Sequence, residues 1–351
     1  MTEDSPKVAL MVLNYNGLEW LKICLPSISR STYEKLETYV IDNGSTDGSV
    51  EYVESEFPGV NVIAFEKNLG FAKAYNDAVS RINADYIVLL NNDTRVLTPA
   101  WIDLLVEEAE TSTKLAAIGC KIVSMQHKGM LDSLGGCGMR YWRGFMDIGR
   151  DEEDLGQYDA PPITPFSFCG AAVLIRTDLF KFIGGFDTSF FSYLEDVDLS
   201  WRLRLLGYEI GYEPTAKVEH HFSGTARRGN ERWKRYLIHR NLLRMYLKDC
   251  GCSLRWALRN YFLLYSTTIL AELVFHPLEV LPILRGILWN LTNLRSTLAA
   301  RAIVQNQRTV SDASIIQPMY PEFGKKLGFP KGIPSKLLFR ILLGDYTERI
   351  A

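Results

Sequence analysis

VALMVL, at residues 8–13, is an unbroken apolar run of strand length. Such a run predicts a strand that is buried on both faces of a sheet. Apolar residues then recur at helical spacing, at Leu18, Leu21, Leu25 and Ile28. Because parallel strands need a crossover helix between them, a buried strand followed directly by a helix favours a parallel sheet covered by helices.

Strand and helix patterns alternate from there to about residue 125. Further strands are predicted at residues 38–41, 60–65 and 86–90, with helices ending near residues 56, 82 and 111. This alternation predicts an α/β fold with a mostly parallel central sheet. The glycine-rich residues 126–165 are expected to form loops with short strands. Beyond them we expect a strand at residues 171–175, a helix near 195–206 and two short strands around Ile210 and Val218.

The charges divide the chain into two parts. Residues 1–226 hold 19 Lys and Arg against 33 Asp and Glu, whereas residues 227–351 hold 20 against 8. We therefore expect an acidic α/β domain at residues 1–228 and a basic, apolar-rich helical region at residues 229–351. A basic region favours an anionic partner such as a phosphate, a nucleic acid or a lipid surface.

Two apolar stretches of the helical region, 261–275 and 280–291, fall short of the ~20 apolar residues that a membrane-spanning helix needs. Eight cations surround them: Arg240, Arg244, Lys248, Arg255, Arg259, Arg285, Arg295 and Arg301. Helices of this composition suit an anionic membrane surface. The alternative is an ordinary helical subdomain that packs against the α/β domain.

The N-terminus and the cysteines indicate a cytoplasmic protein. The acidic first residues lack the cationic stretch and apolar run of a secretory signal. The six cysteines are scattered without a CxxC pair, so we expect reduced thiols that act as small buried apolar residues. Together with the basic helical region, this predicts a peripheral protein at the inner face of the cell membrane.

Polar side chains follow each of the first four predicted strands. They are Asn14 and Asn16, then Asp42, then Asn68 and Gly70, and finally Asn91, Asn92 and Asp93. Ligands of open α/β sheets bind beyond the carboxyl ends of the strands, where these residues are expected to meet. A carboxylate beside two amides suits a divalent cation that also binds a diphosphate. The alternative is turn formation, in which Asn and Asp are common.

Six motifs resemble those of glycosyltransferase family 2, in the same order. VIDNGSTDGS (40–49) resembles its nucleotide-binding turn, and NLGFA (68–72) with Asn76 resembles its second nucleotide loop. LLNNDT (89–94) is similar to its metal-binding DXD motif, and FCGAA (168–172) resembles the loop beside the sugar. YLEDVDLSWR (193–202) resembles the motif of the catalytic base, and VEHH (218–221) resembles the late histidine of the metal site. The likeness extends over residues 7–225.

The resemblance implies a GT-A fold and an inverting glycosyltransferase that uses a nucleotide-diphosphate sugar and a divalent metal, Mg²⁺ or Mn²⁺. It implies metal ligands at Asp93, Asn91 and His220, although family members usually carry an acid where this chain has Asn91. His221 is the alternative histidine. The implied donor-binding residues are Asn14, Asn16, Asp42, Asn68, Gly70, Asn76, Asn92, Gly170 and Ala171.

An inverting displacement needs one carboxylate that faces the acceptor hydroxyl. Asp196 is the predicted base, and Asp198 is the third candidate. Glu195 lies about 100° around the helix from Asp196 and is expected to orient neighbouring groups. The alternative is that these acids only favour the helix N-terminus through its dipole.

The expected function is transfer of a sugar to a saccharide or polyprenyl-linked acceptor in the synthesis of a surface polysaccharide. The motif variant resembles that of rhamnosyltransferase-like members, so rhamnose is the first candidate sugar. Two alternatives remain open: an inactive nucleotide-sugar-binding or membrane scaffold protein, and a sugar nucleotidyltransferase. The latter carries a glycine- and arginine-rich loop where this chain has Asn14 to Gly17. Nucleic-acid binding would explain the basic region but not the acids at the strand ends, so no nucleic-acid partner is expected. The sequence leaves the oligomeric state open.

Overall fold

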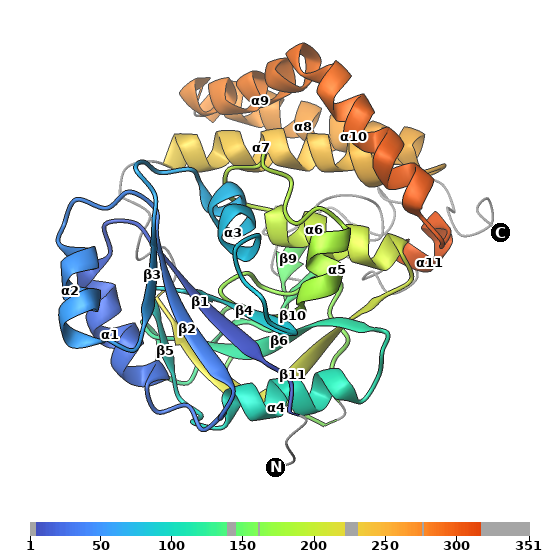
Figure 1. The fold of residues 1–351 in the computed structure, drawn as a ribbon. Helices are drawn as coiled ribbons and strands as arrows, with labels where there is room; N and C mark the ends of the chain where they lie inside the picture. Colours follow the sequence, from blue (N-terminus) through green and yellow to red (C-terminus); the bar gives the residue numbers. More distant parts are fainter. Residues whose placement is uncertain (1–4, 139–144, 161, 222–230, 276, 317–351) are drawn as a thin grey trace.

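The computed structural model describes residues 5–138, 145–160, 162–221, 231–275 and 277–316. In these residues nine strands form one curled sheet, with helices on both of its faces and a layer of helices from the C-terminal part of the chain (Figure 1). The predicted α/β class is confirmed.

One half of the sheet is parallel. It consists of β3 (Asn61–Ala64), β2 (Leu36–Asp42), β1 (Val8–Asn14) and β4 (Tyr86–Asn91), in that order. Alternate residues of β1 supply both cores. Leu10 packs with α1 on one face, and Met11 packs with α3 on the other. This two-sided burial is the reason why the first strand is an unbroken apolar run.

The other half of the sheet is mixed, so the prediction of a mostly parallel sheet holds only for the first half. Strand β10 (Ala172–Arg176) runs antiparallel between β4 and β6 (Leu115–Ser124). The two short strands expected around Ile210 and Val218 are one strand, β11 (Glu209–His220), which runs parallel to β6 with an irregularity between Glu213 and Lys217.

Short strands complete the sheet, as the glycine-rich segment predicts. Strand β5 (Thr94–Val96) pairs with β11, and β7 (Leu131–Ser133) pairs with β6. Strands β8 (Gly136–Gly138) and β9 (Phe145–Asp147) form a separate two-stranded sheet. Pairing with β5 places the end of β11 beside the chain that follows β4.

Six helices cover the two faces of the sheet. They are α1 (Leu18–Ile28), α2 (Ser49–Glu56), α3 (Phe71–Val79), α4 (Trp101–Glu110), α5 (Thr177–Phe182) and α6 (Glu195–Leu205). The first, second and fourth share a core on one face, whereas α3, α5 and α6 share a core on the other. Helix α6 therefore begins on the same face of the sheet as α3.

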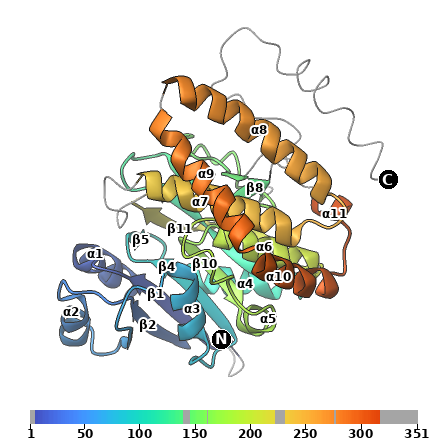
Figure 2. The ribbon, with the colours of Figure 1, turned by 90° about the horizontal axis from the view of Figure 1, so that it is seen from above.

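The C-terminal helices form a layer over the face of the sheet that carries α3 and α6 (Figure 1, Figure 2). They are α7 (Glu231–Asp249), α8 (Leu254–Phe275), α9 (Val280–Thr292), α10 (Leu294–Gln307) and α11 (Asp312–Ile316), with a 3₁₀ turn at Pro277–Glu279. A third core joins this layer to the rest of the molecule: Trp201 of α6 packs with Tyr246 of α7 and Tyr261 of α8. Among the described residues, none of the helices is both long enough and apolar enough to span a bilayer.

Four of the eight cations that suit a membrane surface point into the molecule instead. Arg240, Arg244 and Lys248 lie on one face of α7 and are buried against the loop that precedes α6. Arg301 also turns inward and donates to the carbonyl oxygen of Leu247 at 2.9 Å. For these four residues the structure favours the alternative, a helical layer that packs against the α/β domain, where buried acids and carbonyl groups need donors.

Candidate active site

The ends of β1, β2 and β4 form one hydrogen-bonded cluster. The Asn14 side-chain amide donates to Asp42 Oδ1 at 3.0 Å, and the Asn92 amide donates to Asn14 Oδ1 at 2.7 Å. All three side chains are buried. A methyl group at Gly17 would lie 2.1 Å from Asn92 Nδ2, so the glycine provides the space that the amide occupies. The prediction that these three residues meet at one edge of the sheet is therefore correct.

The turn after β2 closes over this cluster. Asp42 Oδ2 accepts a hydrogen bond from the Ser45 N–H at 2.9 Å, which leaves its carboxylate with two donors. Asn16 has the left-handed φ of 48°, and its side-chain oxygen accepts from the Thr46 N–H at 2.8 Å. Asn16 is exposed, so its main chain borders solvent beside the buried Asp42.

The second nucleotide loop is held by Asn43, a residue that the sequence analysis did not single out. Its side-chain amide donates to Asn68 Oδ1 at 3.1 Å, and its oxygen accepts from the Leu69 N–H at 2.8 Å. Gly70 follows with a φ of 81°, and a methyl group there would lie 2.5 Å from the Phe191 ring. Asn43 directly follows Asp42 in the motif at residues 40–49. This place beside a predicted site residue is the sequence signal that could have identified it.

Asn76 faces the protein main chain. Its amide donates to the Phe186 carbonyl oxygen at 2.8 Å, and its oxygen accepts from the Phe186 N–H at 2.9 Å. These two bonds attach α3 to the loop between α5 and α6. Its predicted role in donor binding stays a prediction.

Asp93 and His220 form the second cluster. His220 Nε2 lies 3.4 Å from Asp93 Oδ1, and both side chains are buried. On the other side of the ring, Nδ1 lies 2.6 Å from Oδ2 of the buried Asp132. Burial lowers the pKa of His220. Hydrogen bonding to Asp132 and the charge of Asp93 outweigh this effect and raise the pKa to about 9. Asp132 belongs to β7, and no sequence motif marked it.

The surroundings of Asp93 bear on whether a divalent metal could bind there. Asp93 Oδ1 is buried, and the structure gives it no hydrogen-bond partner among the described residues. However, no group of three or more His, Cys, Asp or Glu side chains in the described ranges could hold a metal ion. Asp93 and His220 are suited to supply two ligands of a divalent metal, and they do not form a closed site. Asn91 ends β4, where its N–H donates to the Ala171 carbonyl oxygen at 3.0 Å.

The predicted base lies in the first turn of α6. Asp196 Oδ2 accepts from the Gly170 N–H at 3.0 Å, and Oδ1 accepts from the Val197 N–H at 2.8 Å. Burial raises the pKa of Asp196 to about 6, although both N–H donors oppose that shift. Burial and the neighbouring Asp196 raise the pKa of Glu195 well above its ordinary value. Burial thus favours the neutral form of both carboxyl groups.

Asp198, the third candidate, is bound inside the protein. Its carboxylate lies 2.8 Å from Arg202 Nε and 2.5 Å from Lys248 Nζ, and all three side chains are buried. Because two cations neutralise it away from solvent, Asp198 serves to attach α6 to α7. It is not free to accept a proton from an acceptor hydroxyl.

The loop of residues 68–72 and the predicted base adjoin each other through Phe71. A methyl group at Gly170 would lie 3.3 Å from the Phe71 ring and 3.6 Å from the Asp196 carboxylate. The Phe71 N–H donates to the Phe191 carbonyl oxygen at 2.7 Å, just before α6 begins. Asp93 directly follows Asn92 of the first cluster. The predicted residues of the nucleotide, metal and base motifs thus lie in adjoining parts of the molecule.

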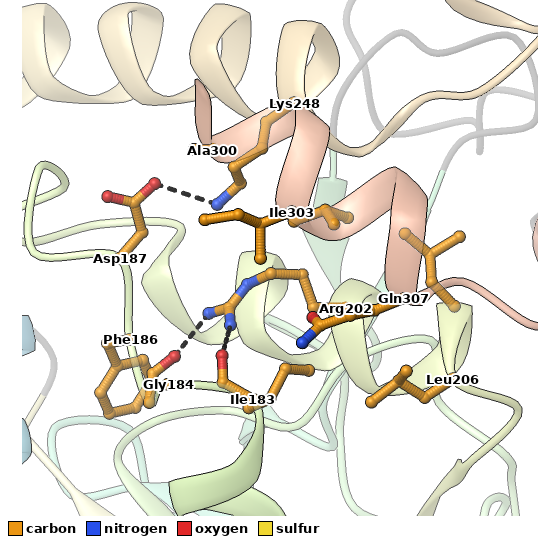
Figure 3. A pocket seen from close by; sticks show the side chains of 13 residues that line it. Ile183, Gly184, Phe186, Asp187, Arg202, Leu206, Lys248, Ala300, Ile303 and Gln307 are labelled. Atoms are coloured by element: carbon orange, nitrogen blue, oxygen red, sulfur yellow. Dashed lines mark hydrogen bonds and ion pairs between the residues drawn. The ribbon is translucent and has the colours of Figure 1, made fainter. Parts of the chain in front are cut away.

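Figure 3 shows a cavity of about 150 Å³ in a different place. It lies between the loop after α5, the C-terminal half of α6 and α10, and Asp187, Arg202 and Lys248 supply its charged groups. Their side chains already pair with groups of the protein. Asp196 lies at the other end of α6, so the cavity is distinct from the predicted donor site.

Solved structures with the same fold are glycosyltransferases. A mannosyltransferase from Pyrobaculum calidifontis, in complex with GDP-mannose and Mn²⁺, aligns with a TM-score of 0.50 at 17% identity and covers 87% of this chain and 86% of its own. GalNAc-T7, solved with UDP, GalNAc and Mn²⁺, aligns with a TM-score of 0.53 at 15% identity, over 78% of this chain and 58% of its own. The fold is thus that of a GT-A glycosyltransferase, as predicted.

Family models identify the chain more closely. The model described as glycosyl transferase family 2 matches residues 10–151, and the one described as glycosyl transferase family group 2 matches residues 86–292. The chain belongs to glycosyltransferase family 2, and it is an enzyme of the glycosyltransferase class.

Two curated relatives have names that describe enzymes acting on or making glycans. An N-acetylglucosaminyl-diphospho-decaprenol L-rhamnosyltransferase of Mycobacterium tuberculosis is 28% identical over 298 residues, which cover 76% of this chain and 92% of the relative. A poly-beta-1,6-N-acetyl-D-glucosamine synthase of Staphylococcus epidermidis is 25% identical over 60% of this chain and 48% of its own length. The resemblance to rhamnosyltransferase-like members of the family is confirmed.

Proposed function

We propose that the protein transfers a sugar, with rhamnose as the first candidate, from a nucleotide-diphosphate donor to a lipid-linked saccharide, with inversion and with a divalent metal. The observation that carries the proposal is the adjoining arrangement of three groups: the Asn14–Asp42–Asn92 cluster, the Asp93–His220 pair and Asp196. The Mycobacterium relative, which acts on a decaprenol-linked sugar by its name, supports the acceptor class.

The nucleotide would bind at the strand-end cluster. Asp42 offers a carboxylate to a base or ribose, and the left-handed backbone at Gly70 allows the donor to approach the main chain closely. Asn16, Asn68, Asn76, Asn92, Gly170 and Ala171 are the other proposed donor contacts. A bound Mg²⁺ or Mn²⁺, held by Asp93 and His220 with Asn91 nearby, would stabilise negative charge on the leaving diphosphate.

Asp196 would accept the proton of the acceptor hydroxyl as its oxygen attacks the anomeric carbon. The bond from that carbon to the diphosphate oxygen breaks on the opposite side, and this displacement inverts the configuration. The Gly170 N–H fixes the Asp196 carboxylate for this step. Glu195 is buried in the same turn of α6, where we expect it to orient neighbouring groups.

A membrane surface at the cytoplasmic face is the proposed location of the reaction, and the helical region 229–351 is the proposed contact with it. Helix α9 carries a row of exposed leucines, and α10 continues it; the row comprises Leu281, Leu284, Leu288, Leu291, Leu294 and Leu298. Arg285 and Arg295 are exposed beside this row. Exposed leucines flanked by cations support binding to an anionic lipid surface, where a polyprenyl-linked acceptor also resides.

The proposal is tested with a panel of nucleotide sugars. We expect one donor, with dTDP-rhamnose tested first, to raise the melting temperature in the presence of Mn²⁺, because a ligand that binds only the folded state stabilises it. With that donor, the enzyme should transfer label to polyprenyl-diphosphate saccharides.

Asp196→Ala should keep donor binding and lose transfer. If the variant retains both, Asp196 is not the base. If no donor binds, the proposed function is wrong.

A further inference from the structure

The loop of residues 190–194, which ends just before Glu195 and the predicted base, has an unusual backbone. Phe191, Tyr193 and Leu194 have φ values of 61°, 69° and 67°, although none of them is a glycine. Residues with a side chain rarely adopt this left-handed region, and such conformations persist only where the surroundings hold them. Leu194 is also the residue from which α6 begins, so this loop sets the position of Glu195 and Asp196.

Helix α7 supplies the groups that hold the loop. The Asn241 side-chain amide nitrogen lies 3.1, 2.9 and 2.7 Å from the carbonyl oxygens of Phe190, Ser192 and Tyr193. Asn241 is fully buried, and its own oxygen accepts from Arg240 Nε at 2.8 Å. One side chain thus contacts three of the five carbonyl groups between Phe190 and Leu194.

Arg240 extends the same contact. Its guanidinium donates to the carbonyl oxygens of Ser189 and Phe190 at 2.8 and 2.7 Å. Trp289 of α9 packs against the guanidinium, with 4.9 Å between the ring centre and Cζ. Arg240 is therefore fixed between α9 and the loop, and it orients the amide of Asn241.

The loop also contacts the donor-binding side of the molecule. The Phe191 ring packs where a side chain at Gly70 would lie, and the Phe191 carbonyl oxygen accepts from the Phe71 N–H. Phe71 in turn lies against Gly170, whose N–H holds Asp196. A displacement of the loop would therefore move the base relative to the donor loop.

We propose that Asn241 is a positioning residue of the transfer reaction: it holds the left-handed loop Phe190–Leu194 and thereby places Asp196 against the acceptor. The inference rests on the proposed function for its kinetic part only. Without the amide, three carbonyl groups lose a buried donor and the strained residues can relax to ordinary backbone conformations. Small displacements of a catalytic group are costly, since a shift of about 1 Å can lower a rate about 100-fold.

The test compares Asn241→Ala with Asn290→Ala. Asn290 is also a buried asparagine, and its amide donates to the main-chain carbonyl oxygens of Arg240 and Gly286 instead of to carbonyl groups of the loop. We expect both variants to lose stability. Only Asn241→Ala should lower kcat, by about 10- to 100-fold, while its KM for the donor stays within about threefold of the wild type. Asn241→Asp keeps the size but loses the donor hydrogens, so it should resemble the alanine variant.

Amide hydrogen exchange of residues 189–197 provides a readout that does not depend on activity. We expect faster exchange in this segment for Asn241→Ala and unchanged exchange there for Asn290→Ala. Unchanged exchange in Asn241→Ala, or an unchanged kcat with faster exchange, would overturn the inference. If the wild type transfers no sugar at all, the exchange experiment still decides whether Asn241 holds the loop.

Discussion

His220 and Asp132 are 88 residues apart in the chain, yet Nδ1 of the histidine lies 2.6 Å from Oδ2 of the aspartate. This contact fixes the ring so that Nε2 points towards Asp93 Oδ1, 3.4 Å away. Arg150 lies 3.2 Å from the other Asp132 oxygen and holds the carboxylate in turn. Histidines that bind metals are commonly oriented by a carboxylate in this way.

Asp132→Asn should weaken metal binding, because the amide neither orients His220 as firmly nor makes its ring as good a ligand. Loss of such a supporting carboxylate typically lowers metal affinity about 10- to 100-fold. Titration with Mn²⁺, followed by electron paramagnetic resonance in the presence of a nucleotide diphosphate, measures the change. Asp147→Asn is the control, because the Asp147 carboxylate accepts hydrogen bonds from Ser133 and Arg150. Equal affinity in the Asp132 variant and the wild type would contradict the assignment of His220.

The pKa of Asp196, raised to about 6 by burial, predicts an acid limb in the activity. A base must be deprotonated, so kcat/KM should fall about tenfold per pH unit below pH 6. The stability should change in the opposite sense. The folded state favours the neutral carboxyl of Asp196. Its contribution to the free energy of unfolding is therefore present below pH 3.8 and is lost as the pH rises through about 6.

Asp196→Asn should therefore melt at a higher temperature than the wild type at pH 8, and the difference should disappear in acid. Thermal unfolding between pH 4 and pH 8 measures this, and the same preparations give the activity profile. A flat activity profile down to pH 5 would show that another group accepts the proton.

Gly70→Ala should damage both stability and donor binding. The alanine would have to adopt a φ of 81°, and its methyl group would lie 2.5 Å from the Phe191 ring. Gly48→Ala is the matched control, because Gly48 has a φ of 84° with open space around it. The control should cost about 1–2 kcal/mol from backbone strain alone. Chemical denaturation should show a larger loss for Gly70→Ala, and equal losses would mean that Phe191 moves freely.

Most of the strand-end cluster could be predicted from the sequence because a buried parallel strand determines where its carboxyl end lies. Asn14, Asp42 and Asn92 each follow such a strand, and the three strands are neighbours. Asp132 could not be found in this way. It belongs to a three-residue strand that pairs irregularly with β6, and no local pattern indicates which side chain it will face.

The cations of α7 show a second limit. Cations recur on α7 at helical spacing among apolar residues, at Arg240, Arg244 and Lys248. This pattern is the same whether the basic face of the helix contacts a membrane or is buried in the protein. The acids and carbonyl groups that the cations contact decide between these alternatives. Asp187, Asp198 and the carbonyl groups of the loop before α6 lie elsewhere in the sequence, and only the fold brings them to α7.

Lys248→Met should destabilise the protein strongly, because Lys248 is buried and contacts Asp187 at 3.0 Å (Figure 3). Its Nζ also lies 2.5 Å from Asp198. Removing one partner of a buried ion pair leaves an uncompensated charge and typically costs 3–5 kcal/mol. Arg295→Met removes an exposed cation from the same helical region and should change stability by less than about 0.5 kcal/mol. Urea denaturation distinguishes the two. Similar small losses would show that the charges near Asp198 are solvated.

Membrane binding needs point variants rather than a deletion of the helical region, because a chain that ends near residue 230 would lack Lys248 and leave Asp198 without this partner. Leu284→Glu and Leu288→Glu place charges in the exposed row of α9, where these side chains are 48% and 59% exposed. Leu155→Glu is the control on the α/β body, at 75% exposure. Each α9 variant should lower sedimentation with phosphatidylglycerol vesicles about tenfold, since burial of a leucine contributes roughly 1.5–3 kcal/mol. Equal sedimentation of all three would exclude this face.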